Sequence, residues 1–190
     1  DLGNPNYVDE IKQHINGKNV DVIIGGPPCQ GFSLTGTRIL NDPRNSLFKS
    51  FFNSIDIFNP RVVLLENVKG MNTLYGGIVI KQINSEFELR GYKTVSALLN
   101  SSDFGVPQNR ERFFIVASKI DKKLEMPKPI LKKEFKISCE DAISDLHDFQ
   151  NSFGDEESVY QSKPISFYQK LMRLKTNTLF NHVGTAHKQF

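Results

Sequence analysis

The 190-residue sequence contains no tryptophan, only two cysteines and no apolar run near the roughly 20 residues that a membrane-spanning helix needs. The two cysteines lie in very different contexts, which argues against a disulfide framework and is typical of a reducing compartment. No signal peptide is recognisable, and the first residue is aspartate, so the sequence reads as if it begins inside a longer protein. The formal net charge of +3 is compatible with a polyanionic partner and does not identify one.

The segment that organises the rest of the sequence is Asp21-Val-Ile-Ile-Gly-Gly-Pro-Pro-Cys29. Its apolar run, bounded by glycines and prolines, is typical of a buried parallel strand. The two prolines end the strand because neither can donate a hydrogen bond to a ladder. Cys29 therefore follows the carboxyl end of a central strand, where open α/β sheets bind ligands. A small buried cysteine with a purely structural role is the alternative.

Helical and strand patterns alternate along the chain as far as about residue 118, which predicts a doubly wound α/β layer. The clearest helix is expected over residues 46–58, where leucine, isoleucine and phenylalanine repeat every three or four residues. The other expected helices are 4–15 and 77–90, and the expected strands are 19–25, 62–65, 92–99 and 113–117.

The pattern changes after residue 118. Residues 119–136 are rich in lysine and proline and are interpreted as a solvated connector, with a basic arm that touches phosphate as the alternative. Ser138 to Asp141 resembles a capping box, which places Cys139 in the first turn of a short helix and predicts a structural or surface role for it. An acidic loop over 151–158 and a helix near residues 167–174 follow, then a polar end with no clear element. We therefore expect three parts: 1–118, 119–136 and 137–190.

Polar groups stand at three neighbouring strand ends: Cys29, Glu66 and the pair Arg110 and Arg112. Taken singly, the glutamate could cap a helix or pair with an arginine, and the arginines could face solvent. Together they predict a constructed site. No metal is expected, because none of the histidines has partners at ligand spacing; they are His14, His147, His182 and His187.

The same segments resemble the cytosine-5 DNA methyltransferase family in both order and spacing. The matching motifs are Pro27-Pro28-Cys29-Gln30 with Gly31-Phe32-Ser33, then Glu66-Asn67-Val68, then Gln108-Asn-Arg110-Glu-Arg112. The segment Asp42-Pro-Arg44-Asn-Ser-Leu47-Phe48 is similar to the family's stretch between the first two motifs. The resemblance covers roughly residues 1–118. It implies a Rossmann-like, mostly parallel sheet of the class I S-adenosylmethionine-dependent methyltransferases, incomplete at its N-terminal side.

The chemistry of cytosine agrees with the resemblance. Carbon 5 is a poor nucleophile, and a thiolate that adds at carbon 6 activates it, which is the role expected for Cys29. Glu66 fits the carboxylic acid that donates a proton to ring nitrogen 3. The resemblance implies that Arg112 holds the carbonyl oxygen of the base and that Arg110 supports the site.

The resemblance also implies contacts outside the reacting groups. A stacked base cannot reach a thiol, so the cytosine has to be flipped out of the duplex. Residues 30–42 are interpreted as a lid over DNA, with Gln30, Ser33 and Arg44 as DNA-binding residues. S-adenosylmethionine is expected beside the Cys29 strand, with Asp1, Leu2, Pro28 and Leu47 lining its pocket.

The leading hypothesis is a DNA cytosine-5 methyltransferase of a bacterial restriction–modification system, acting on double-stranded DNA in the bacterial cytoplasm with no membrane association. One alternative keeps the chemistry and acts on transfer RNA. The other is a non-catalytic nucleic-acid-binding fragment, because the family's glycine-rich donor loop and its acidic ribose-binding residue are not in the sequence. The sequence leaves open whether it is a fragment, a truncated enzyme that is inactive alone, or one part of a split enzyme that needs a complementing chain segment.

Overall fold

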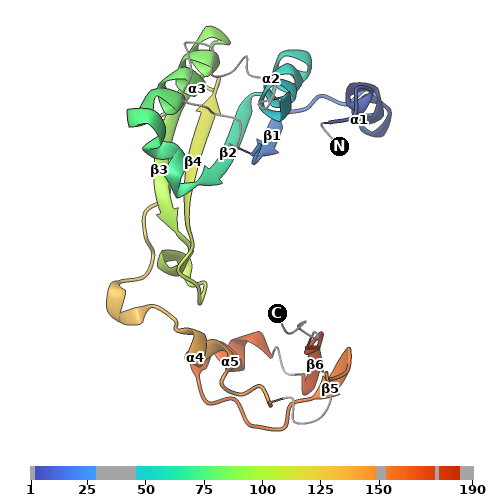
Figure 1. The fold of residues 1–190 in the computed structure, drawn as a ribbon, viewed down its shortest axis with the longest axis vertical. Coiled ribbons are helices and arrows are strands. Elements are labelled where there is room, and N and C mark those ends of the chain that lie inside the picture. Colours follow the sequence, from blue (N-terminus) through green and yellow to red (C-terminus); the bar gives the residue numbers. More distant parts are fainter. Residues whose placement is uncertain (1–2, 29–45, 149–152, 174–175, 185–190) are drawn as a thin grey trace, which may run out of the picture. The chain divides into compact units, whose positions relative to one another are not determined.

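The computed structural model describes residues 3–28, 46–148, 153–173 and 176–184. It divides into two compact units, the first formed by residues 1–100 and 111–128 and the second by residues 101–110 and 129–190 (Figure 1). The three-part division expected from the sequence stays a prediction.

The first unit alternates helices and strands, as the sequence predicts. Its elements are α1 (Tyr7–Ile15), β1 (Val22–Gly25), α2 (Ser46–Phe58), β2 (Val62–Val68), α3 (Ile78–Leu89), β3 (Lys93–Asn100) and β4 (Glu111–Ser118), with 3-10 turns over Lys69–Asn72 and Leu74–Gly77. The sheet order is β1-β2-β4-β3. β1 pairs with β2 in parallel, and β4 pairs with both β2 and β3 in antiparallel. β1, β2 and β3 therefore run in one direction and β4 in the other, which confirms a Rossmann-like, mostly parallel α/β sheet.

One face of this sheet, the covered face, carries the hydrophobic core. On β2 and β4 it consists of Val63, Leu65, Asn67, Phe113, Ile115 and Ala117, all of them buried. The core joins the apolar members of this set to side chains of α2 and α3, among them Phe48, Ile55, Ile83 and Phe87. The phenylalanine repeat of residues 46–58 thus forms a helix because it can bury one face against the sheet.

The other face, the open face, carries the alternate side chains of the same strands. It includes Val22, Ile24, Leu64, Glu66, Arg112, Phe114 and Val116, which are half-buried or exposed. Val22 and Ile24 are 51% and 71% exposed, and the core cluster of the described residues contains none of the seven.

The second unit has shorter elements. They are a 3-10 turn (Ser101–Phe104), a second one (Lys133–Phe135), α4 (Cys139–Ile143), β5 (Glu157–Val159), α5 (Phe167–Met172) and β6 (Thr178–Phe180), and β5 pairs with β6 in antiparallel. The expected capping box is confirmed: the Ser138 hydroxyl accepts the Asp141 amide, and the Asp141 carboxylate accepts the Ser138 amide. The expected loop over 151–158 and the expected featureless end are wrong in part, because three-residue strands form there.

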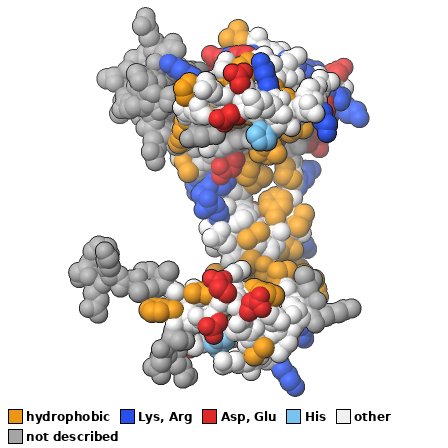
Figure 2. All heavy atoms as spheres, turned by 90° about the vertical axis from the view of Figure 1, so that its right-hand side faces the viewer, with side chains coloured by type: hydrophobic (Ala, Val, Ile, Leu, Met, Phe, Trp, Pro, Cys, Tyr) orange, Lys and Arg blue, Asp and Glu red, His pale blue; other side chains and the backbone are white. Residues whose placement is uncertain are grey.

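On the face in Figure 2, acidic and basic side chains are interspersed over the first unit. No helix in the described part of the chain is long and apolar enough to cross a membrane.

Candidate active site

β2 places the predicted carboxylate, that of Glu66, next to the carboxyl end of β1. The sequence placed Glu66 just after a strand of residues 62–65, but β2 continues to Val68. The reason is pairing with β4, which extends the ladder to the partners Val68 and Arg112. Glu66 therefore lies two residues before the end of β2, and its backbone belongs to a regular strand rather than to a loop.

Glu66 and Arg112 are in direct contact. The Arg112 Nε lies 3.0 Å from the Glu66 Oε1, and the two side chains are 24% and 37% exposed respectively. The Arg112 Nη1 also donates to the Glu111 carbonyl at 2.8 Å. These two contacts hold the guanidinium in place. The pair can therefore offer a carboxylate and a guanidinium to a ligand on the open face.

The segment that follows β1 lies against the same carboxylate. A Cβ built on Gly26 would lie 2.9 Å from the Glu66 Oε2. The next residue, Pro27, is buried, and its carbonyl accepts the Asn67 Nδ2 at 2.7 Å. The chain then passes through the exposed Pro28 toward Cys29. Glu66 thus stands between Arg112 of β4 and the segment that leads to the predicted nucleophile.

The other predicted site residues fall into two groups. Cys29, Gln30, Ser33, Arg44, Asp1 and Leu2, and the expected lid over 30–42, lie outside the described residues. Leu47 is half-buried near the start of α2, and Arg110 belongs to the second unit, where its carbonyl accepts the Ser101 amide at 3.1 Å. The roles of all these residues stay predictions.

Two residues of this region were missed by the sequence reasoning: Asn67 and Gly26. The signal for Asn67 was its position, two residues after the buried Leu65 in an alternating strand, where a polar side chain needs a partner. Gly26 gave no local signal, because the group that occupies the space beside it belongs to β2.

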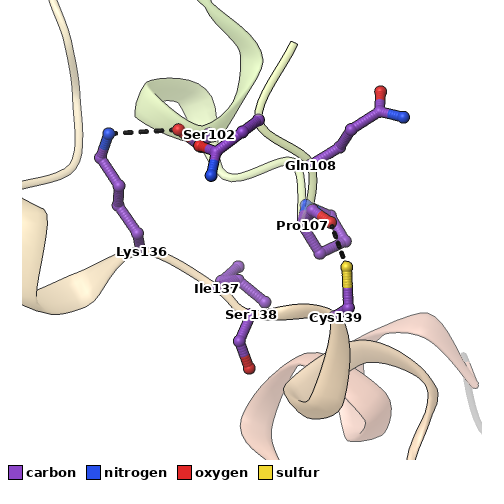
Figure 3. A pocket seen from close by; sticks show the side chains of 8 residues that line it. Ser102, Pro107, Gln108, Lys136, Ile137, Ser138 and Cys139 are labelled. Atoms are coloured by element: carbon purple, nitrogen blue, oxygen red, sulfur yellow. Dashed lines mark hydrogen bonds between the residues drawn. The ribbon is translucent and has the colours of Figure 1, made fainter.

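The second unit contains a cavity of about 330 Å³, lined by residues that include Gln108, Lys136 and Cys139. Figure 3 shows Lys136 reaching toward Ser102, with Nζ 3.1 Å from the hydroxyl, and Cys139 reaching toward Pro107. Lys136 also forms an ion pair with Asp103, and the exposed Cys139 thiol donates to the Pro107 carbonyl at 3.3 Å. The ammonium and the thiol are thus engaged within the unit, which agrees with a structural or surface role for Cys139.

Comparison with known protein families identifies the family of this chain. Residues 5–188 match the model of the C-5 cytosine-specific DNA methylase family. The chain belongs to this family. It is 41% identical over 183 residues to the Type II methyltransferase M.DdeI of Desulfomicrobium norvegicum, covering 92% of this chain and 44% of that protein. It is 41% identical over 182 residues to the Type II methyltransferase M1.HphI of Haemophilus parahaemolyticus, covering 94% of this chain and 42% of that protein.

Among solved structures, the chain resembles an Escherichia coli prophage protein described as a DNA modification methyltransferase. The two share 27% sequence identity at a TM-score of 0.67, over 99% of this chain and 58% of the other. The chain thus spans less than half the length of the two curated relatives and somewhat more than half of the solved one. The family resemblance drawn from the motifs is confirmed.

Proposed function

We propose that the full-length protein methylates carbon 5 of cytosine in double-stranded DNA. The observation that carries the proposal is the Glu66–Arg112 pair, 3.0 Å apart and set beside the segment that leads into Cys29. The names of the relatives, Type II methyltransferases from bacteria, favour DNA over transfer RNA as the substrate. They also favour a restriction–modification system in the bacterial cytoplasm as the setting.

Each group has a distinct task in the proposed reaction. The Cys29 thiolate forms a bond to carbon 6 of a flipped-out cytosine, and the electron pair of the 5,6 double bond becomes available at carbon 5. Glu66 stabilises the ring by proton donation at nitrogen 3, and Arg112 binds the carbonyl oxygen through guanidinium N–H groups. After carbon 5 has gained the methyl group, its hydrogen leaves as a proton to water, nitrogen 3 returns its proton to Glu66, the double bond re-forms, and the bond from sulfur to carbon 6 breaks.

S-adenosylmethionine supplies the electrophilic methyl group when it is bound. The described residues fit such a donor at the carboxyl end of β1, because Pro28 is exposed and Leu47 is only half-buried, so both can offer apolar surface to it. Asp1 and Leu2 would complete that contact. No metal has a part in the proposal.

The experiment uses the full-length protein and a long DNA duplex of varied sequence, which contains all short recognition sequences, with 5-fluorocytosine in place of every cytosine, so the recognition sequence need not be known. Fluorine cannot leave as a proton does, so the enzyme should remain bonded to the DNA after methyl transfer. We expect a protein–DNA adduct that survives denaturation and forms only with S-adenosylmethionine. A cytosine-5 methyltransferase of known recognition sequence is the positive control.

Three variants assign the roles. Cys29→Ser should abolish the adduct, whereas Cys139→Ser, the matched cysteine control, should leave it intact. Glu66→Gln should slow adduct formation by roughly 100-fold or more, because a general acid typically contributes about that factor. Two results would contradict the proposed function: an adduct that still forms with the Cys29→Ser variant, and a wild-type protein that forms no adduct. The second result would favour the non-catalytic alternative.

A further inference from the structure

We infer that Asn67 and Gly26 are positioning residues that fix the Glu66 carboxylate relative to the chain entering Cys29. Asn67 holds the backbone of Pro27 through a hydrogen bond, and Gly26, which has no Cβ, leaves room for the carboxylate. The inference rests on the proposed function, because it assigns roles within the same site.

Asn67 connects β2 to the segment after β1 at the point where the ladder cannot. The parallel pairing of β1 with β2 ends at Gly25 and Leu65, and the two prolines that follow Gly26 have no N–H to extend it. The Asn67 Nδ2 supplies the missing donor, with a 2.7 Å hydrogen bond to the Pro27 carbonyl. Asn67 is 5% exposed and Pro27 is buried. Losing this bond would take a hydrogen-bond donor away from the carbonyl of a buried residue, which is costly.

The other end of the Asn67 amide is also used. Its Oδ1 accepts the Val68 amide at 2.9 Å, which fixes the direction in which the Nδ2 points. An aspartate at this position could keep the Val68 contact but would turn an oxygen toward the Pro27 carbonyl. The Asn67→Asp variant has a side chain of nearly the same size as asparagine and lacks only the Nδ2 donor.

Gly26 is required for space rather than for backbone conformation. It is not among the glycines with positive φ. Its hypothetical Cβ would lie 2.9 Å from the Glu66 Oε2 and 3.4 Å from the Glu66 carbonyl oxygen. A methyl group there would displace the carboxylate, whose Oε1 is the atom that contacts Arg112. Glu66 is thus confined between β4 and the backbone that follows β1.

The test compares Gly26→Ala and Asn67→Asp with two matched controls in the full-length protein. Gly70→Ala adds a methyl group where nothing lies within 4 Å, and Asn53→Asp on α2 removes an Nδ2 donor to the hydroxyl of Tyr7 on α1. The readouts are the single-turnover rate of adduct formation, the affinity for DNA and the thermal unfolding midpoint. We expect both test variants to form the adduct roughly 10- to 100-fold more slowly, because small misplacements of reacting groups cost about that much. DNA affinity should be unchanged, and both controls should keep the wild-type rate.

A double-mutant cycle separates positioning from a general structural effect. In a Glu66→Ala background the methyl group of Gly26→Ala has no carboxylate to displace, so it should cause little further loss. Equal loss factors in both backgrounds would overturn the role of Gly26. A folded Asn67→Asp variant that reacts at the wild-type rate would overturn the role of Asn67. If the aspartate variant does not fold, Asn67→Ala, which introduces no charge, is tested in its place by the same criterion. Either result, with the adduct still dependent on Cys29, leaves the proposed function standing.

Discussion

The two faces of the four-stranded sheet use neighbouring residues for different purposes. On the covered face, Leu65 is fully buried in a core built with α2 and α3. On the open face, Leu64 is half-buried and its neighbour Glu66 meets Arg112. Because successive residues of a strand point to opposite faces, one strand contributes both to stability and to the candidate site.

The difference separates the positions that stabilise the fold from those that form the candidate site. Covered-face positions bury apolar surface, and the polar exception among them, Asn67, is hydrogen-bonded through both its amide nitrogen and its amide oxygen. The open face carries a partly exposed ion pair, a type of contact that contributes little to stability in solvent. Its apolar side chains, such as Val22 and Ile24, nevertheless give β1 and β2 the continuous apolar character of strands buried on both faces.

The largest contrast is expected between two adjacent leucines. Leu65→Ala should lower the free energy of unfolding of the 190-residue chain by about 2–5 kcal/mol, because it opens a cavity in a closely packed core. Leu64→Ala should cost about 1 kcal/mol, because its side chain already retains contact with water. Urea denaturation followed by circular dichroism measures both.

The same pair in the full-length protein sharpens the comparison. If segments outside this chain cover the open face there, the cost of Leu64→Ala should rise toward that of Leu65→Ala. Equal costs in the 190-residue chain itself would show that the two faces are not packed differently.

Much of the covered face could be predicted from local sequence. The repeat of Leu47, Phe48, Phe51 and Phe52 predicted α2 with the bounds that the structure has. The end of β2 could not be predicted in this way, because its last residues are held in the strand by β4, which follows more than 40 residues later. β5 and β6 have three residues each, too few for a period of two to be recognised.

The candidate site divides along the same line. The motifs predicted that Glu66 and Arg112 would meet, and the structure places their atoms 3.0 Å apart; their catalytic roles stay predictions. The contacts of Asn67 with Pro27 and of Glu66 with Gly26 each span 40 residues. Such contacts depend on the register of β1 against β2, which no local pattern specifies.

A smaller effect, dependent on pH, is expected at Tyr92 on the covered side. Its buried hydroxyl donates to the Pro60 carbonyl at 2.6 Å. Burial raises the pKa of Tyr92, Asp56 raises it further, and Arg90 opposes them. Because the folded-state pKa is raised, the stabilisation is complete below the pKa of an unfolded tyrosine, about 10, and is lost as the pH rises above it.

Tyr92→Phe tests this sign. Near pH 8 the variant should be less stable by about 1 kcal/mol, the typical net contribution of one hydrogen bond. The gap between wild type and variant should close as the pH is raised into the alkaline range, when measured by urea denaturation at each pH. A gap that stays constant would show that the Tyr92 hydroxyl titrates alike in the folded and unfolded chains.

The smallest effect is expected at the most exposed apolar position of the open face. Ile24 is 71% exposed, whereas Ile23 beside it packs against the core. Ile24→Thr keeps the branched Cβ that strands favour and should change the free energy of unfolding by less than about 0.5 kcal/mol, as is usual for surface positions. Ile23→Thr should cost clearly more, because it brings a hydroxyl against apolar side chains. Ile24→Thr should also reduce self-association of the 190-residue chain, measured by light scattering, because it removes apolar surface from an exposed patch. If Ile24→Thr destabilises the chain as much as Ile23→Thr does, then the open face is packed in solution and the contrast between the two faces does not hold.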